Sequence, residues 1–142
     1  MEDLPDRKQQ EHDSFSRRLH PAGLYVRDIR SDGHCLYNAI ADQLDMRGGT
    51  KLPKSSLPTH LHLRAMAADY ISQNKDLFMP FLESEAEHQV LSDKDFQQYC
   101  RKITQPHPVV WGGYAEIVAL SHVLRRQVAM LELSSLHLHP RL

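Results

Sequence analysis

Apolar residues recur at helical spacing in four stretches of the chain. Leu36, Ile40 and Leu44 follow one another at four-residue intervals, which predicts a helix of about three turns beginning at or next to Cys35. Further helices are predicted after a cap at Thr59, after a cap at Ser92, and over Tyr114–Leu124. Their apolar stripes are Leu63, Ala67 and Ile71, then Phe96, Tyr99, Cys100 and Ile103, then Ile117, Leu120 and Leu124.

Two other stretches have the pattern of strands. Leu24–Ile29 alternates between its two faces, and Gln127–Leu133 is a mostly apolar run that predicts a strand buried on at least one side. The first 22 residues are largely polar, which favours a mobile tail, with a frayed helix over Gln9–Leu19 as the alternative. The two predicted strands flank the predicted helices, so we expect both kinds of element in the chain.

Composition limits the classes of partner. With 142 residues the chain has the size of one ordinary domain, and 17 Lys and Arg against 18 Asp and Glu give a net charge of -1. We therefore expect neither nucleic acid nor a membrane as a partner, and the residues indicate no oligomeric state. Two cysteines and the absence of a long apolar run or signal peptide favour a cytoplasmic, alternatively nuclear, protein.

The candidate chemistry lies where a turn meets a predicted helix. Asp32-Gly33 is a turn-forming pair, and Cys35 follows at the helix start. Unpaired N–H groups at that end of a helix favour an anion, here the nucleophilic thiolate. The amides from Asp32 to Cys35 could also face an oxyanion that develops beside the sulfur. The open alternative is a buried structural cysteine, which is how we interpret Cys100 on its apolar stripe.

The run Ser-Asp-Gly-His-Cys-Leu-Tyr-Asn-Ala-Ile over 31–40 resembles the nucleophile motif of the ovarian tumour (OTU) family of cysteine deubiquitinases. The segment 61–82 and Trp111-Gly112-Gly113 agree with that family in order and spacing. The resemblance covers 23–133, between a polar tail at 1–22 and a divergent tail at 134–142. It implies an α/β (α+β) protein with the OTU-like fold, a mixed sheet between helical layers. It also implies Cys35 as nucleophile, Asp32 as the acidic position, ubiquitin or polyubiquitin as partner, and no cofactor or metal.

The same resemblance raises the question of the catalytic base. OTU enzymes carry a catalytic histidine on a strand downstream of the segment that matches 127–133, and this chain ends at Leu142. The resemblance therefore implies a C-terminally truncated domain that lacks its last strands. We reject His34 as a substitute because the turn points its side chain away from Cys35. His137 or His139 could fold back toward the thiol, whereas His122 lies off its apolar stripe and is expected to be solvated.

Two side-chain patterns have structural as well as functional interpretations. His60 and His62, like His137 and His139, alternate in a way that a metal could bridge, but no carboxylate or cysteine stands at ligand spacing, so we expect no zinc site. Trp111 is expected to anchor the core.

Two functional hypotheses remain: a thiol-dependent deubiquitinase, or a catalytically inactive form that only binds ubiquitin or a protein partner.

Overall fold

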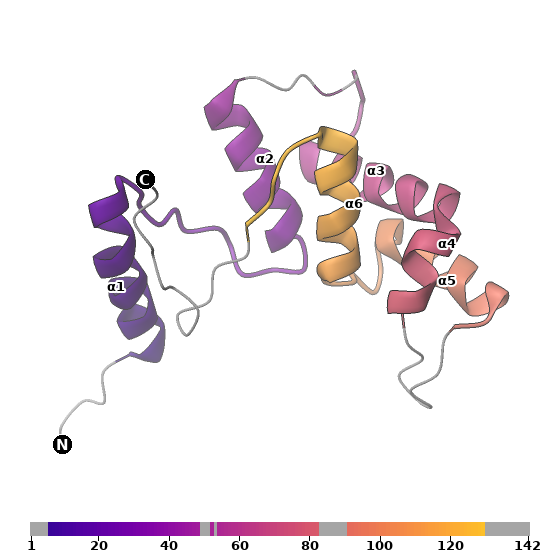
Figure 1. Ribbon diagram of the computed structural model, residues 1–142, viewed down its shortest axis with the longest axis horizontal. Coiled ribbons are helices and arrows are strands. Elements are labelled where there is room, and N and C mark those ends of the chain that lie inside the picture. The colour runs from indigo at the N-terminus through magenta and orange to yellow at the C-terminus, as the bar shows by residue number, and fades with distance from the viewer. Residues whose placement is uncertain (1–5, 49–51, 53, 83–90, 130–142) are drawn as a thin grey trace. The chain divides into compact units, whose positions relative to one another are not determined.

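The computed structural model describes residues 6–48, 52, 54–82 and 91–129, and its chain divides into two units (Figure 1). The first unit comprises Met1–Asp28 with Ala129–Leu142, and the second comprises Ile29–Val128. The residues of the candidate site that the structure describes, including Asp32, Cys35 and the Trp-Gly-Gly segment, belong to the second unit.

Among its described residues, the first unit contains one α-helix and a short 3-10 helix. Helix α1 spans Arg7–Leu19, and η1 follows over His20–Ala22. Asp6 caps the start of α1 by accepting the Lys8 N–H at 3.0 Å, and Gly23 ends η1 with a left-handed φ of 72°. This polar stretch is therefore helical, with a cap at each end. Of the two predictions for it, the helix over 9–19 describes it better than the mobile tail.

The second unit is a set of helices packed around α3. Its elements are α2 (Cys35–Arg47), α3 (Thr59–Gln73), α4 (Lys75–Phe78), η2 (Met79–Phe81), α5 (Asp93–Thr104) and α6 (Tyr114–Leu124). Helix α3 packs against α2, α5 and α6, and its Leu63, Ala67 and Ile71 are fully buried. The helices predicted from apolar spacing are therefore confirmed, and α3 carries the centre of the core.

The predicted caps have different outcomes. Ser92 accepts the Asp95 N–H at 3.2 Å and begins α5, whose Phe96, Cys100 and Ile103 are buried, as the sequence predicted. The prediction for Thr59 is wrong, because Thr59 is already the first helical residue of α3 and Pro58 precedes it as the capping residue. Proline at that position has no N–H to satisfy and is compatible with a helix start.

The predicted strands are absent from the part of the chain that the structure describes. Leu24–Ile29 has no strand partner, and 127–129 continue from α6 without strand pairing. The rest of the second predicted strand, 130–133, lies outside the described residues. An alternating pattern makes a strand only where a neighbour supplies the hydrogen-bond ladder. The expected mixed sheet is thus not confirmed.

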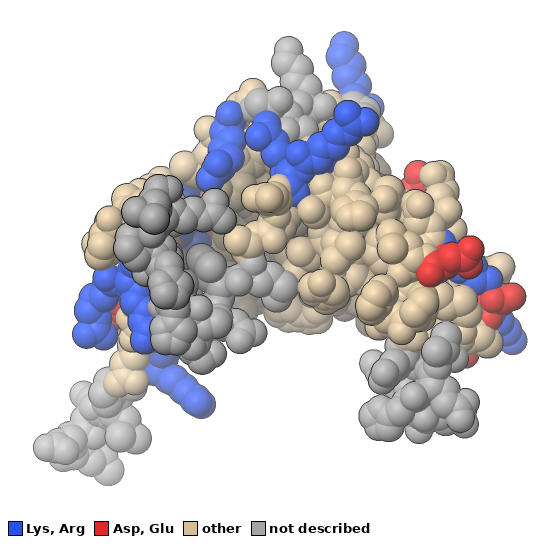
Figure 2. All heavy atoms as spheres, in the orientation of Figure 1, with Lys and Arg blue, Asp and Glu red and all other residues tan. Residues whose placement is uncertain are grey.

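The two signs of charge gather in different places on the face drawn in Figure 2, where basic side chains cluster away from the acidic ones. On the face drawn in Figure 2, acidic side chains lie near the end formed by α4 and α5, and uncharged side chains occupy a broad area beside them. Lys75 and Asp93 form an ion pair there. None of the described helices is both long and apolar enough to span a bilayer.

Candidate active site

Cys35 is the first residue of α2 and is partly buried. The predicted position of this cysteine at the start of a helix is therefore confirmed. Asp32 organises the turn that delivers it. The Asp32 carboxylate accepts the His34 N–H at 2.9 Å, and the Asp32 carbonyl accepts the Cys35 N–H at 3.1 Å. The His34 carbonyl then accepts the Asn38 N–H at 2.9 Å, which is the first hydrogen bond of the helix.

These hydrogen bonds change the expected set of oxyanion donors. The N–H groups of His34 and Cys35 are directed at Asp32, and the Asp32 N–H donates to the Arg30 carbonyl at 3.0 Å. Three of the four amides between 32 and 35 therefore already have acceptors within the turn. The amides of Leu36 and Tyr37, in the first turn of α2, have no carbonyl acceptor within their own helix. Those two N–H groups belong to the positive end of α2, the end at which Cys35 stands.

His34 has a partner other than the thiol. Its Nδ1 accepts a hydrogen bond from Arg64 Nε at 3.0 Å, and its ring lies 4.6 Å from that of His60, centroid to centroid. Burial, followed by the charges of Arg64 and His60, lowers the pKa of His34 below its ordinary value of 6.5, while Asp32 opposes the shift. The neutral imidazole is thus an acceptor for Arg64, which agrees with rejecting His34 as the base.

Arg64 is a site residue that the sequence interpretation missed. It lies on α3 with 2% of its surface exposed and donates to the carbonyls of Gly33, Ile103 and Val110 as well as to His34. Its guanidinium carbon also lies 4.3 Å from the centroid of the Tyr37 ring. The signal was available in the apolar stripe of α3, where an arginine stands three residues before Ala67 and seven before Ile71.

The segment 109–113 packs directly on the nucleophile turn. A side-chain carbon added to Gly33 would overlap Val109 Cγ1, and one added to Gly112 would overlap Leu36 Cδ2. Both glycines are therefore needed for close approach, which gives the Trp-Gly-Gly segment a structural reason. Trp111 itself is 57% exposed, so its interpretation as a core anchor is wrong.

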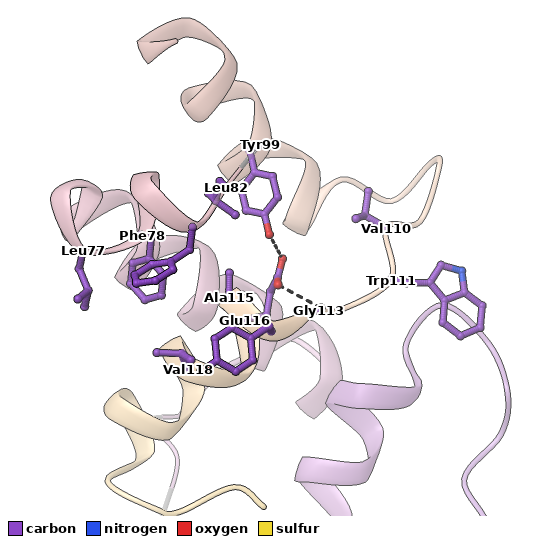
Figure 3. A pocket seen from close by; sticks show the side chains of 12 residues that line it. Leu77, Phe78, Leu82, Tyr99, Val110, Trp111, Gly113, Ala115, Glu116 and Val118 are labelled. Atoms are coloured by element: carbon purple, nitrogen blue, oxygen red, sulfur yellow. Dashed lines mark hydrogen bonds between the residues drawn. The ribbon is translucent and has the colours of Figure 1, made fainter. Parts of the chain in front are cut away.

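A second buried polar group holds the start of α6. Glu116 is 2% exposed and accepts the Tyr99 hydroxyl at 2.6 Å and the Gly113 N–H at 3.1 Å, so both carboxyl oxygens have donors (Figure 3). Burial, followed by Glu116, raises the pKa of Tyr99 and keeps its hydroxyl a donor.

The side chains of Figure 3 line an apolar pocket of about 390 Å³ beside α6. Cys35 is not among the residues that line it. Phe81 and Tyr114, which do line it, are strongly exposed, whereas Trp111 points away from the other labelled side chains. The pocket and the thiol are thus distinct features of the second unit.

The remaining candidates have other surroundings. His122 is exposed, and its Nδ1 lies 2.9 Å from the Tyr70 hydroxyl. Cys100 is buried, as predicted, and burial raises the pKa of its thiol. In the described ranges no cluster of three or more His, Cys, Asp or Glu could hold a metal ion. His137 and His139 lie outside those ranges.

A partly buried cysteine that opens a helix after an Asp-Gly turn is one arrangement in which thiol nucleophiles occur. The chain belongs to the OTU-like cysteine protease family, whose model matches residues 30–138. The solved structure of the OTUD1 OTU domain resembles it with a TM-score of 0.59 and 24% identity, over 81% of this chain and 63% of that one. That likeness supports the OTU fold for the matched part.

Curated relatives carry names that state an activity. The Deubiquitinase OTUD6B of Xenopus laevis is 35% identical over 80% of this chain and 35% of its own length. The human protein of the same name is 31% identical over 95% of this chain and 43% of its own length. The chain thus spans about two fifths of the length of these relatives.

Proposed function

We propose that this chain is an OTU-type deubiquitinase that hydrolyses ubiquitin isopeptide bonds with Cys35 as its nucleophile. Membership of the OTU-like cysteine protease family and the deubiquitinase names of its relatives support the reaction class. The single observation that carries the site is the position of Cys35, partly buried at the first residue of α2. Ubiquitin or polyubiquitin is the corresponding partner.

The proposed reaction follows ordinary thiol chemistry. The Cys35 thiolate attacks the isopeptide carbonyl, a sulfur–carbon bond forms, and the lysine amine leaves with a proton supplied by a general acid. Water then hydrolyses the thioester and releases the ubiquitin carboxylate. The N–H groups of Asp32, His34 and Cys35 already have acceptors within the turn, so we take the amides of Gly33, Leu36 and Tyr37 as the candidate donors to the oxyanion.

Asp32 is proposed to act by shaping the turn. Its carboxylate and carbonyl oxygens together accept two consecutive N–H groups and so set the path of the chain into α2. This assigns the family's acidic position an acceptor role in this chain. An Asp32→Asn variant retains an acceptor oxygen and should keep most of the thiol reactivity, whereas Asp32→Ala should lose it.

A second candidate function is binding of ubiquitin without cleavage. The observation that favours it concerns the general base. Among the described residues no histidine is hydrogen-bonded to Cys35, and His34 and His122 are bonded to Arg64 and Tyr70. Without such a histidine the site can still bind ubiquitin, but no group deprotonates the thiol or protonates the leaving amine. We further propose a cytoplasmic or nuclear location, since the two free cysteines Cys35 and Cys100 form no disulfide framework.

A ubiquitin vinyl sulfone probe tests the nucleophile. The full chain should be labelled at Cys35, and Cys35→Ala should abolish labelling. Cys100→Ala is the matched control, because it removes the other cysteine, which is buried. Labelling that survives Cys35→Ala would refute the assignment.

Diubiquitin cleavage separates the two functions. Cleavage by the wild type that Cys35→Ala removes establishes the hydrolase, and loss of cleavage in a His137→Ala, His139→Ala double variant identifies the C-terminal histidines as the base. Ubiquitin binding by a folded wild type that is neither labelled nor active leaves the binding function. Absence of labelling, cleavage and binding in a folded sample refutes both.

A further inference from the structure

A buried arginine on α3 donates hydrogen bonds to four acceptors, two of them in the nucleophile turn. Arg64 donates from Nη2 to the Gly33 carbonyl at 2.5 Å and from Nε to His34 Nδ1 at 3.0 Å. Its Nη1 donates to the Ile103 carbonyl at 2.9 Å, at the end of α5, and to the Val110 carbonyl at 2.8 Å. The planar guanidinium fixes the directions of all these bonds at once, which a lysine ammonium does not do.

Burial of this charge is costly for stability alone. The guanidinium is held by carbonyl oxygens, an imidazole nitrogen and the face of Tyr37, and no carboxylate within the described ranges forms an ion pair with it. Replacement of a buried charge by an apolar residue of similar volume is often neutral or stabilising when the partners are replaced too. What the arginine supplies that an apolar side chain cannot is orientation of the groups it binds.

The group that Arg64 orients is the peptide unit between Gly33 and His34. Its carbonyl oxygen accepts from Arg64, and its N–H donates to the Asp32 carboxylate at 2.9 Å. In a trans peptide these two groups point in opposite directions within one rigid plane, so Arg64 and Asp32 hold the same plane from its two sides. Glycine at 33 would otherwise allow this plane to rotate at low steric cost. A rotated plane would redirect the chain one residue before Cys35.

We propose that Arg64 is the positioning residue of the Cys35 nucleophile, acting by fixing the Gly33–His34 peptide and the His34 ring and thereby the entry of the chain into α2. This inference builds on the proposed function, since it assigns the arginine a role through Cys35. The hydrogen bonds of Arg64 go to His34 and to the carbonyls of Gly33, Ile103 and Val110, not to the Cys35 sulfur. Its effect on the reaction passes entirely through the geometry of the turn.

Alkylation of Cys35 by iodoacetamide tests the proposal without requiring ubiquitin. The rate is measured across pH for the full chain, with each cysteine quantified by mass spectrometry of its peptide. Arg64→Lys keeps the positive charge and loses the planar guanidinium with its fixed donor directions. Arg64→Met loses the charge and keeps much of the apolar volume. Both should slow alkylation of Cys35 by at least about tenfold and move its pH profile upward. A Cys35 profile that overlays the wild type in either folded variant overturns the proposal.

A matched control distinguishes positioning from a general loss of stability. Ile71→Ala lies on the same helix two turns further on, where the wild-type side chain is fully buried in the core. It should destabilise the protein and leave the Cys35 profile of the folded state unchanged. Labelling of buried Cys100 reports unfolding in every variant. A Cys35 profile that Ile71→Ala shifts as much as Arg64→Lys does would also overturn the proposal.

Two further measurements keep the test decisive. If both Arg64 variants unfold, the wild-type amide of His34 should have an NMR order parameter of about 0.85, as in a rigid helix, and a value below about 0.6 contradicts a peptide held from both sides. Where diubiquitin is cleaved, Arg64→Lys should reduce kcat and leave KM nearly unchanged. Failure of the wild type to react with the ubiquitin probe would refute the hydrolase, while the alkylation result still decides the role of Arg64.

Discussion

Gly33→Ala probes the contact between the nucleophile turn and the segment 109–113. The added carbon would overlap Val109 Cγ1 and lie 3.2 Å from Val109 Cβ. The turn can retreat little, because Arg64 and Asp32 hold the neighbouring peptide. The strain should therefore displace the turn or the facing segment, and both the free energy of unfolding and the reactivity of Cys35 should fall.

The expected magnitude follows from the size of the overlap. An extra carbon forced into a packed site costs about 1–3 kcal/mol. Gly113→Ala is the matched control, since the same added carbon meets Glu116 Oε2 at 3.6 Å, an ordinary contact, and the φ of -129° suits alanine. Its effect should stay within about 0.5 kcal/mol. Val109→Ala removes the overlapping methyl group and, at a partly buried position, should cost about 1 kcal/mol alone.

A double-mutant cycle measured by urea denaturation decides whether the overlap is the cause. The Gly33→Ala, Val109→Ala double variant should be more stable than the sum of the single effects predicts, by about 1–2 kcal/mol, and should recover alkylation of Cys35. Additive effects would show that Gly33 is needed for another reason. A Gly33→Ala variant as stable as Gly113→Ala would refute the steric account altogether.

Three further outcomes are expected. The pKa of His34 in the folded protein lies below its ordinary 6.5, so the folded state binds fewer protons than the unfolded state near that pH. The free energy of unfolding should therefore be highest above about pH 6.5 and fall as the pH is lowered. Urea titrations at several pH values should show a weaker pH dependence for His34→Asn. Tyr99→Phe leaves one oxygen of buried Glu116 without its donor and should cost about 1–3 kcal/mol by the same measurement. Ser92→Ala should cost about 1 kcal/mol through the lost cap of α5, and alkylation of Cys35 should not change.

The helices could be predicted because their determinants are local. Leu36, Ile40 and Leu44 place one apolar stripe on α2, and the start of that helix follows from the Asp-Gly turn before Cys35. The strand predicted over Leu24–Ile29 depends on a partner elsewhere in the chain, and no such partner occurs in the part that the structure describes. Alternation within six residues carries no information about that partner. The same limit applies to Trp111, whose burial depends on what lies opposite it.

Charged residues within the predicted apolar stripes indicate the polar groups that organise the site. Arg64 and Glu116 both interrupt apolar stripes, Arg64 on α3 and Glu116 on α6. A charged residue on a buried face must find hydrogen-bond partners, so its position in the stripe indicates a polar contact between helices and loops. Which groups satisfy it depends on the fold and could not be derived from spacing.

These two buried residues act on one segment. Arg64 binds the Val110 carbonyl, and Glu116 binds the Gly113 N–H, so the Trp-Gly-Gly stretch is held near both of its ends. Between those ends Gly112 packs on Leu36, the residue after Cys35. The nucleophile turn is thus held by side chains of α3 and by a loop that is itself anchored at α3 and α6. Cys35 owes its place to contacts distant in sequence, although its identity as the candidate nucleophile is a local property of the motif.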